Sequence, residues 1–174
     1  MDLTLVNLDN PTETRSFDHG RFEVYKIGPT TLGRATYEGV ERGDGWSVAN
    51  LDDLGEGPGF RKIRPALGVT AFGVNAVVIP PAIESGRHFH DEQEELYFIH
   101  QGELEFVFGE GDGATRHRLG PGGIARVAPN TVRQFRNVGD GDAVYICIGG
   151  KGGYVGRDGR VPEGEESRAR PTSS

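Results

Sequence analysis

The chain has almost no cysteine and no long apolar run. Cys147 is the only cysteine among 174 residues, which excludes an internal disulfide and a zinc site built from several cysteines. No segment approaches the roughly 20 apolar residues that a membrane-spanning helix needs. Residues 1–16 lack the basic and apolar regions of a secretion signal. We therefore expect a cytoplasmic protein with no membrane partner.

The sequence also lacks a concentration of basic charge. The 19 Lys and Arg residues are outnumbered by 26 Asp and Glu, which gives a net charge of −7. The basic residues are scattered, whereas proteins that bind nucleic acid gather them on one surface. We expect no nucleic-acid partner, and the length fits a single domain with a hydrophobic core.

Glycine and proline are abundant and divide the chain into short segments. There are 28 Gly and 10 Pro residues, and no window of helical length repeats apolar residues at intervals of three and four. The segments between them alternate and are rich in β-branched and aromatic residues. They cover residues 21–28, 74–81, 94–102, 103–111, 115–123, 124–129, 132–139 and 143–150. The pattern predicts an all-β domain, a barrel or a sandwich.

The two ends of the chain differ from this middle part. The sequence VNLDN at 6–10 resembles ANLDD at 49–53, so residues 1–45 are predicted to be an N-terminal strand arm. The arm is either a truncated repeat of the strands that lead into the domain or a chance resemblance. The β-barrel is expected at 46–155, and the polar residues 156–174 are predicted to be a flexible tail.

The stretch GRHFHDEQEELYFIHQG, residues 86–102, carries the strongest chemical signal. Residues two apart in a strand share a face, so His88 and His90 project side by side. The chain returns to strand at Glu95, whose carboxylate can reach the pair. Two imidazoles and one carboxylate, with positions left open, form a ligand set for a divalent transition metal such as Fe, Mn, Ni, Co or Zn.

This spacing resembles the first motif of the cupin superfamily. That motif is a glycine, five residues, His-x-His, three or four residues, a glutamate, six residues and a glycine. Here it reads Ala82, five residues, His88-Phe-His90, four residues, Glu95, six residues, Gly102. The resemblance implies a small single-domain cupin of the cupin-2 type, with a double-stranded β-helix (jelly-roll barrel) that forms a homodimer.

A second cupin motif is matched in its spacing and altered in its residues. It reads Gly122, five residues, Ala128-Pro-Asn130, two residues, Arg133, three residues, Asn137. Asn130 replaces a glycine and tolerates a left-handed turn. Arg133 stands where the family has a histidine ligand. Slipping the alignment by one residue would place Gln134 there as a possible fourth position, and such a slip reverses the strand face; the preserved intervals favour Arg133.

Arginine has no lone pair and cannot bind a cation. Facing the barrel interior, Arg133 would hold a small anionic organic ligand beside the metal. Alternatively, its guanidinium pairs with Glu95 or Glu94 and abolishes the metal site. Tyr97 shares the face of Glu95, so its hydroxyl is either a proton carrier or a satisfied core hydroxyl. Arg133 and Tyr97 are thus the candidate catalytic residues.

Two functions follow from the resemblance. One is a metal-dependent enzyme of dioxygenase, isomerase or lyase type that acts on a small anionic organic molecule. The other is a non-catalytic cupin that binds or senses a small molecule without an essential metal, because the fold serves both. The remaining histidines, His19, His100 and His117, have no partner at ligand spacing, and Cys147 is expected to be a small buried hydrophobe.

Overall fold

The computed structural model describes residues 9–17 and 20–165. It divides the chain into two compact units. The smaller unit comprises residues 1–56 and 65–68, and the larger unit the rest of the chain. The sequence suggested a boundary at residue 45, whereas the units part at residue 56. Part of VNLDN, and His19, lie outside the described residues. Within the described part, no helix is long and apolar enough to cross a membrane.

The smaller unit is an antiparallel meander. Strands β1 (Glu13–Phe17), β2 (Gly20–Ile27) and β3 (Thr30–Tyr37) pair in chain order, β4 (Glu41–Gly43) pairs with β5 (Trp46–Val48), and the 3-10 helix η1 (Leu51–Leu54) follows. The carboxylate of Glu23 on β2 is buried and accepts hydrogen bonds from Arg21 and Arg34, at 3.3 and 2.6 Å. These two partners offset the loss of hydration of the buried charge.

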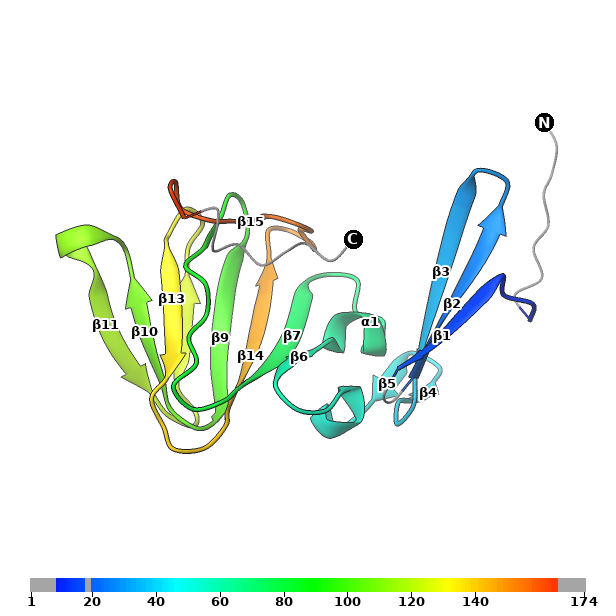
Figure 1. Cartoon of the computed structure of the whole chain (residues 1–174), viewed down its shortest axis with the longest axis horizontal. Helices are drawn as coiled ribbons and strands as arrows, with labels where there is room; N and C mark the ends of the chain where they lie inside the picture. Colours follow the sequence, from blue (N-terminus) through cyan, green and yellow to red (C-terminus); the bar gives the residue numbers. More distant parts are fainter. Residues whose placement is uncertain (1–8, 18–19, 166–174) are drawn as a thin grey trace. The chain divides into compact units, whose positions relative to one another are not determined.

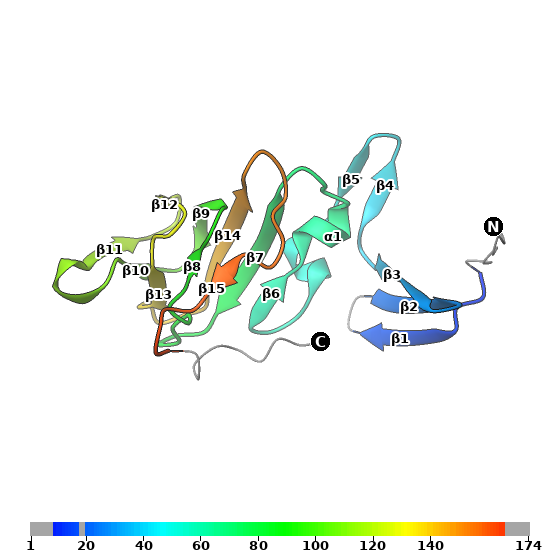
Figure 2. The same ribbon diagram turned by 90° about the horizontal axis from the view of Figure 1, so that it is seen from above.

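The larger unit contains two antiparallel sheets, seen in two views in Figures 1 and 2. The first has the order β11 (Thr115–Leu119), β10 (Leu104–Phe108), β13 (Arg133–Asn137). The second has the order β12 (Ile124–Val127), β9 (Glu94–Gln101), β14 (Ala143–Gly150), β7 (Gly73–Ile79), β6 (Gly59–Arg61). Strands β8 (Phe89–His90) and β15 (Gly159–Arg160) pair separately, and the 3-10 helix η2 (Gly111–Gly113) lies between β10 and β11. The short helix α1 (Ile63–Leu67) contains residues of both units.

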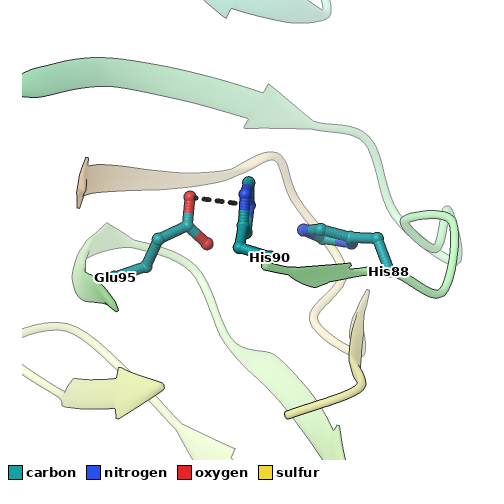
Figure 3. Close-up of side chains that lie close together, drawn as sticks. All are labelled: His88, His90 and Glu95. Carbon is teal, nitrogen blue, oxygen red and sulfur yellow. Dashed lines mark ion pairs between the residues drawn. The ribbon is translucent and has the colours of Figure 1, made fainter. Parts of the chain in front are cut away.

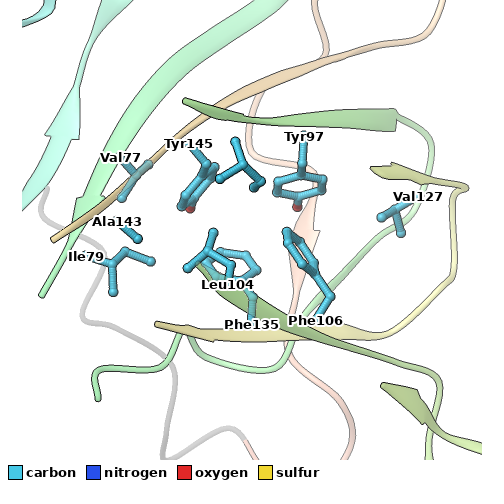
Figure 4. Close-up of a cluster of buried hydrophobic side chains, with 10 residues drawn as sticks. Val77, Ile79, Tyr97, Leu104, Phe106, Val127, Phe135, Ala143 and Tyr145 are labelled. Atoms are coloured by element: carbon cyan, nitrogen blue, oxygen red, sulfur yellow. The ribbon is translucent and has the colours of Figure 1, made fainter. Parts of the chain in front are cut away.

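Alternation along the strands builds one apolar core from both sheets (Figure 4). Every second residue of β9 is buried, which turns Glu95, Tyr97 and Ile99 inward. The rings of Tyr97, Phe106, Phe135 and Tyr145 pack with centroids 4.9–5.8 Å apart. All eight predicted strand segments contain a strand, and the predicted all-β double-stranded β-helix is confirmed.

Three turn positions explain how the two sequence motifs fold. Asn130 has φ 59°, the left-handed conformation expected of it. Ala82, in place of a glycine, has φ 61°, which costs an L-residue about 1–2 kcal/mol. Gly102 has φ 75°, and a Cβ there would lie 2.6 Å from the Cα of Ala143. Only glycine fits at residue 102, because both the backbone conformation and the space require it.

The first part of the predicted flexible tail contains a short strand, β15. We call residues 154–165 the C-terminal strap. Strand β15 of the strap pairs with β8 and sets Gly159 opposite His90, and Asp158 is buried. The prediction relied on the scarcity of apolar residues, whereas the strap is ordered by hydrogen bonds and ion pairs. Residues 166–174 lie outside the described part.

Candidate metal centre

The structure brings His88, His90 and Glu95 together, as the sequence predicted (Figure 3). One potential ligand atom from each lies within 4.8 Å of the other two. The backbone N–H groups of His88 and Arg133 each donate to the other residue's carbonyl, which fixes His88 immediately before β8, the strand that carries His90. Glu95 lies on β9 with its side chain facing the core, and its Oε1 lies 3.3 Å from His90 Nε2.

The two carboxylate oxygens of Glu95 have different partners. Oε2 accepts a hydrogen bond from the Tyr97 hydroxyl at 2.5 Å and forms an ion pair with the Arg133 guanidinium. Oε1 faces His90 and accepts a hydrogen bond from the Cys147 thiol at 3.3 Å. The pairing of Arg133 with Glu95, which the sequence analysis gave as the alternative to ligand binding, is therefore present. It occupies one oxygen and leaves the other directed at the histidines.

Arg133, rather than Gln134, lies beside the cluster. The Arg133 side chain is 1% exposed, and it also donates to the Tyr97 hydroxyl and to the Thr131 carbonyl, both at 3.3 Å. Gln134 donates to the Ser85 carbonyl at 3.0 Å instead. The guanidinium thus holds protein groups in place, and the register that preserved the motif's intervals is the one observed.

Burial and charge set the protonation of the possible ligands. Burial alone would raise the pKa of Glu95, but the hydrogen bond with His90 and the charge of Arg133 outweigh it and hold the pKa below its usual range. Burial, helped by the Arg133 charge, lowers the pKa of His88. Glu95 is therefore ionised and His88 neutral at neutral pH, the forms that bind a metal.

Tyr97 and Cys147 donate hydrogen bonds to Glu95. Burial is the largest cause that raises the pKa of both groups, and the negative charge of Glu95 adds to it. Tyr97 is thus the satisfied core hydroxyl that the sequence left as one alternative. Cys147, expected to be a small buried hydrophobe, is only partly buried. It contacts Glu95, a candidate metal ligand, directly.

Sequence reasoning missed two residues that help to fix His90, Gln93 and Asp158. The amide of Gln93 forms a hydrogen bond with His90 Nδ1 at 2.7 Å. Asp158 accepts hydrogen bonds from the backbone N–H groups of Glu92 and Gln93, at 3.1 and 2.8 Å. Burial would raise the pKa of Asp158, but these N–H donors outweigh it and lower the pKa. No spacing rule relates Asp158 to residues 65 positions earlier.

Replacing Asp158 tests whether it fixes the loop that carries Gln93. Asp158→Ala is expected to lower the free energy of unfolding by about 1–3 kcal/mol, because the buried N–H group of Gln93 and the partly buried N–H group of Glu92 lose their acceptor. Hydrogen exchange measured by mass spectrometry should show faster exchange at Glu92 and Gln93. Asp158→Asn keeps an acceptor oxygen and should lose less stability. Unchanged protection of both amides in Asp158→Ala would show that the contact contributes nothing.

The cluster opens onto a cavity of about 950 Å³ in the larger unit. Its lining combines the His88, His90 and Glu95 side chains with an apolar wall that includes Val77, Ile79 and Phe135. A cavity of this size accommodates a small organic molecule, and the polar groups on its wall could orient one.

Comparison with known proteins supports the resemblance drawn from the two motifs. Residues 75–149 match the family described as "Cupin domain". The match contains β8 through β13, all but the last residue of β14, and both sequence motifs. Among curated proteins, none matches the chain.

Several solved structures resemble the chain. A Klebsiella pneumoniae protein with a double-stranded beta-helix domain is 23% identical over 47% of this chain and 69% of its own, with a TM-score of 0.43. A sugar phosphate isomerase from Silicibacter pomeroyi is 29% identical over 62% and 60%, with a TM-score of 0.42. A DMSP lyase from Ruegeria pomeroyi is 26% identical over 55% and 46%, with a TM-score of 0.46.

Proposed function

We propose that the larger unit binds a divalent transition metal through His88, His90 and Oε1 of Glu95. The observation that carries the proposal is the convergence of two imidazoles and one carboxylate, within 4.8 Å, on the wall of a cavity. This donor set suits Fe, Mn, Co, Ni and Zn. A bound metal would act as a Lewis acid toward a ligand in the cavity.

The contacts of the histidines fit this proposal. The hydrogen bond between Gln93 and His90 Nδ1 fixes the ring with Nε2 toward Glu95. A glutamine amide presents either its N–H or its oxygen to a ring nitrogen, depending on its rotation. With the oxygen toward Nδ1–H, the Nε2 lone pair of His90 is available to a metal. His88 Nδ1 lies 3.0 Å from the Gly86 carbonyl, which leaves Nε2 as its ligand atom in the same way.

The charges around the cluster favour an anionic ligand. Arg133 already neutralises the charge of Glu95. A divalent ion bound beside this ion pair would therefore give the site a net positive charge. An organic anion offsets that charge, while its carbon atoms contact the apolar wall. In this proposal Arg133 and Tyr97 are positioning residues that hold Glu95, and the chemistry is of dioxygenase, isomerase or lyase type.

One observation favours the second candidate, a small-molecule binding cupin without an essential metal. Both oxygens of Glu95 have hydrogen-bond or ion-pair partners in the protein itself. A buried carboxylate satisfied in this way is stable without a cation.

Metal reconstitution separates the two candidates. Protein purified without a histidine tag is incubated with Fe²⁺, Mn²⁺, Co²⁺, Ni²⁺ or Zn²⁺ in turn and desalted, and the retained metal is measured by elemental mass spectrometry. The proposal predicts retention of about one equivalent of at least one metal, as expected of a three-ligand site. If none of the five is retained, the metal proposal fails and the binding cupin stands.

A further inference from the structure

Arg133 is buried and does not line the cavity, so an anionic ligand in the cavity would contact a different cation. Two other arginines line the cavity, Arg87 and Arg157. Arg87 forms ion pairs with Glu110, at 3.0 Å, and with Glu165. Arg157 forms no side-chain ion pair with any residue that the structure describes. It is therefore the cavity arginine whose guanidinium is available to a ligand.

The backbone of the C-terminal strap holds Arg157 at the cavity. On one side, Asp158 is fixed by the backbone N–H groups of Glu92 and Gln93. Arg160 donates to the Arg157 carbonyl at 3.1 Å, and β15 then pairs with β8 so that Gly159 faces His90. Arg157 thus lies two residues from the strand position opposite a candidate metal ligand.

The conformation of Arg157 is unusual for its residue type. Its φ is 58°, in the left-handed region, which costs an L-residue about 1–2 kcal/mol. The preceding residue, Gly156, is a glycine and would adopt a left-handed conformation without strain. The chain instead has this conformation at the arginine. Strained positions that their neighbours over-determine occur preferentially at ligand sites, and Arg157, which is exposed, is one of the residues that line the cavity.

We infer that Arg157 binds the oxyanion group of the cavity's ligand and determines its specificity. This inference rests on the proposed function and extends it to the ligand's class: an organic anion with a carboxylate or phosphate group at Arg157 and a second polar group at the His88, His90 and Glu95 cluster. The planar guanidinium fork binds two oxygens of either anion at once, which a lysine does not do.

The test compares Arg157→Gln with Arg118→Gln. Arg118 lies on β11, is exposed, carries the same charge and does not line the cavity; its guanidinium lies 3.7 Å from the carboxylates of Glu103 and Glu105. Malonate, succinate and inorganic phosphate are titrated into ¹⁵N-labelled parent and variants, with and without Co²⁺, while the amide and arginine Nε–H shifts are followed. Metal content is measured separately for each protein.

We expect at least one anion to shift the Arg157 Nε–H signal in the parent. Its affinity should fall about tenfold or more in Arg157→Gln and change less than about twofold in Arg118→Gln. The relative affinities of the two dicarboxylates and phosphate identify the oxyanion. Equal losses in both variants, an unchanged affinity in Arg157→Gln, or no binding of any of the three anions to the parent would overturn the inference. Failure of the parent to retain Co²⁺ would count against the metal site, whereas the metal-free titration still decides the role of Arg157.

Discussion

Protein carrying both His88→Ala and His90→Ala is expected to retain less than about one tenth of the metal that the parent retains. The two substitutions remove both imidazole donors and leave Glu95 as the single protein ligand. Altering a residue that merely supports a ligand already weakens metal binding by about 10–100-fold, so removing two ligands should have at least that effect. The measurement is elemental mass spectrometry after identical loading and desalting.

The matched control replaces His100 and His117 with alanine. Both are exposed and neither belongs to the cluster, so the control removes the same number of imidazoles from the surface. It should retain the parent's metal content. A similar loss of metal in the control, or full retention in the cluster variant, would mean that any bound metal is held elsewhere.

Arg133→Met is expected to lower the free energy of unfolding by about 3–5 kcal/mol, the usual consequence of removing one partner of a buried ion pair. Glu95 is buried, and Arg133 is its cationic side-chain partner on Oε2. Without the guanidinium, the carboxylate must be protonated or hydrated in the core, and the Tyr97 hydroxyl and Thr131 carbonyl also lose a donor. Urea unfolding followed by far-ultraviolet circular dichroism measures the change.

Two further variants define the cause of that loss. Arg133→Met combined with Glu95→Gln removes both charges and should recover at least about half of the stability. Arg116→Met breaks an exposed pair with Glu105, 3.1 Å long, and should change stability by less than about 1 kcal/mol. If Arg133→Met loses no more stability than Arg116→Met, the buried pair does not stabilise the fold.

The sequence predicted the parts of the structure that depend on local periodicity. Strands β9 and β14 alternate between core and solvent, so their residues show the period of two. The spacing of His88, His90 and Glu95 likewise depends on one strand, a turn and the next strand. Strand β3 was missed because most of its residues are exposed, so burial imposes no pattern on them.

Other features depend on contacts between distant segments and could not be read from the sequence. Whether Arg133 would meet a ligand or Glu95 was left open, because the answer depends on how β13 packs against β9. Asp158 contacts Glu92 and Gln93, which lie inside the first motif, and the polar composition around Asp158 argued against any order. Its hydrogen bonds to backbone groups leave no signature in the residues at 92 and 93.

The unequal partners of the Glu95 oxygens also limit how this residue can coordinate. Since Oε2 is held by Arg133 and Tyr97, Glu95 can offer a metal one oxygen and not a chelating pair. With one nitrogen from each histidine, the protein would fill about three positions of an octahedral ion. The positions left would accept a chelating ligand together with water. Arg133, although it never reaches the cavity, would in this way set the denticity of Glu95 and the number of sites left for the ligand.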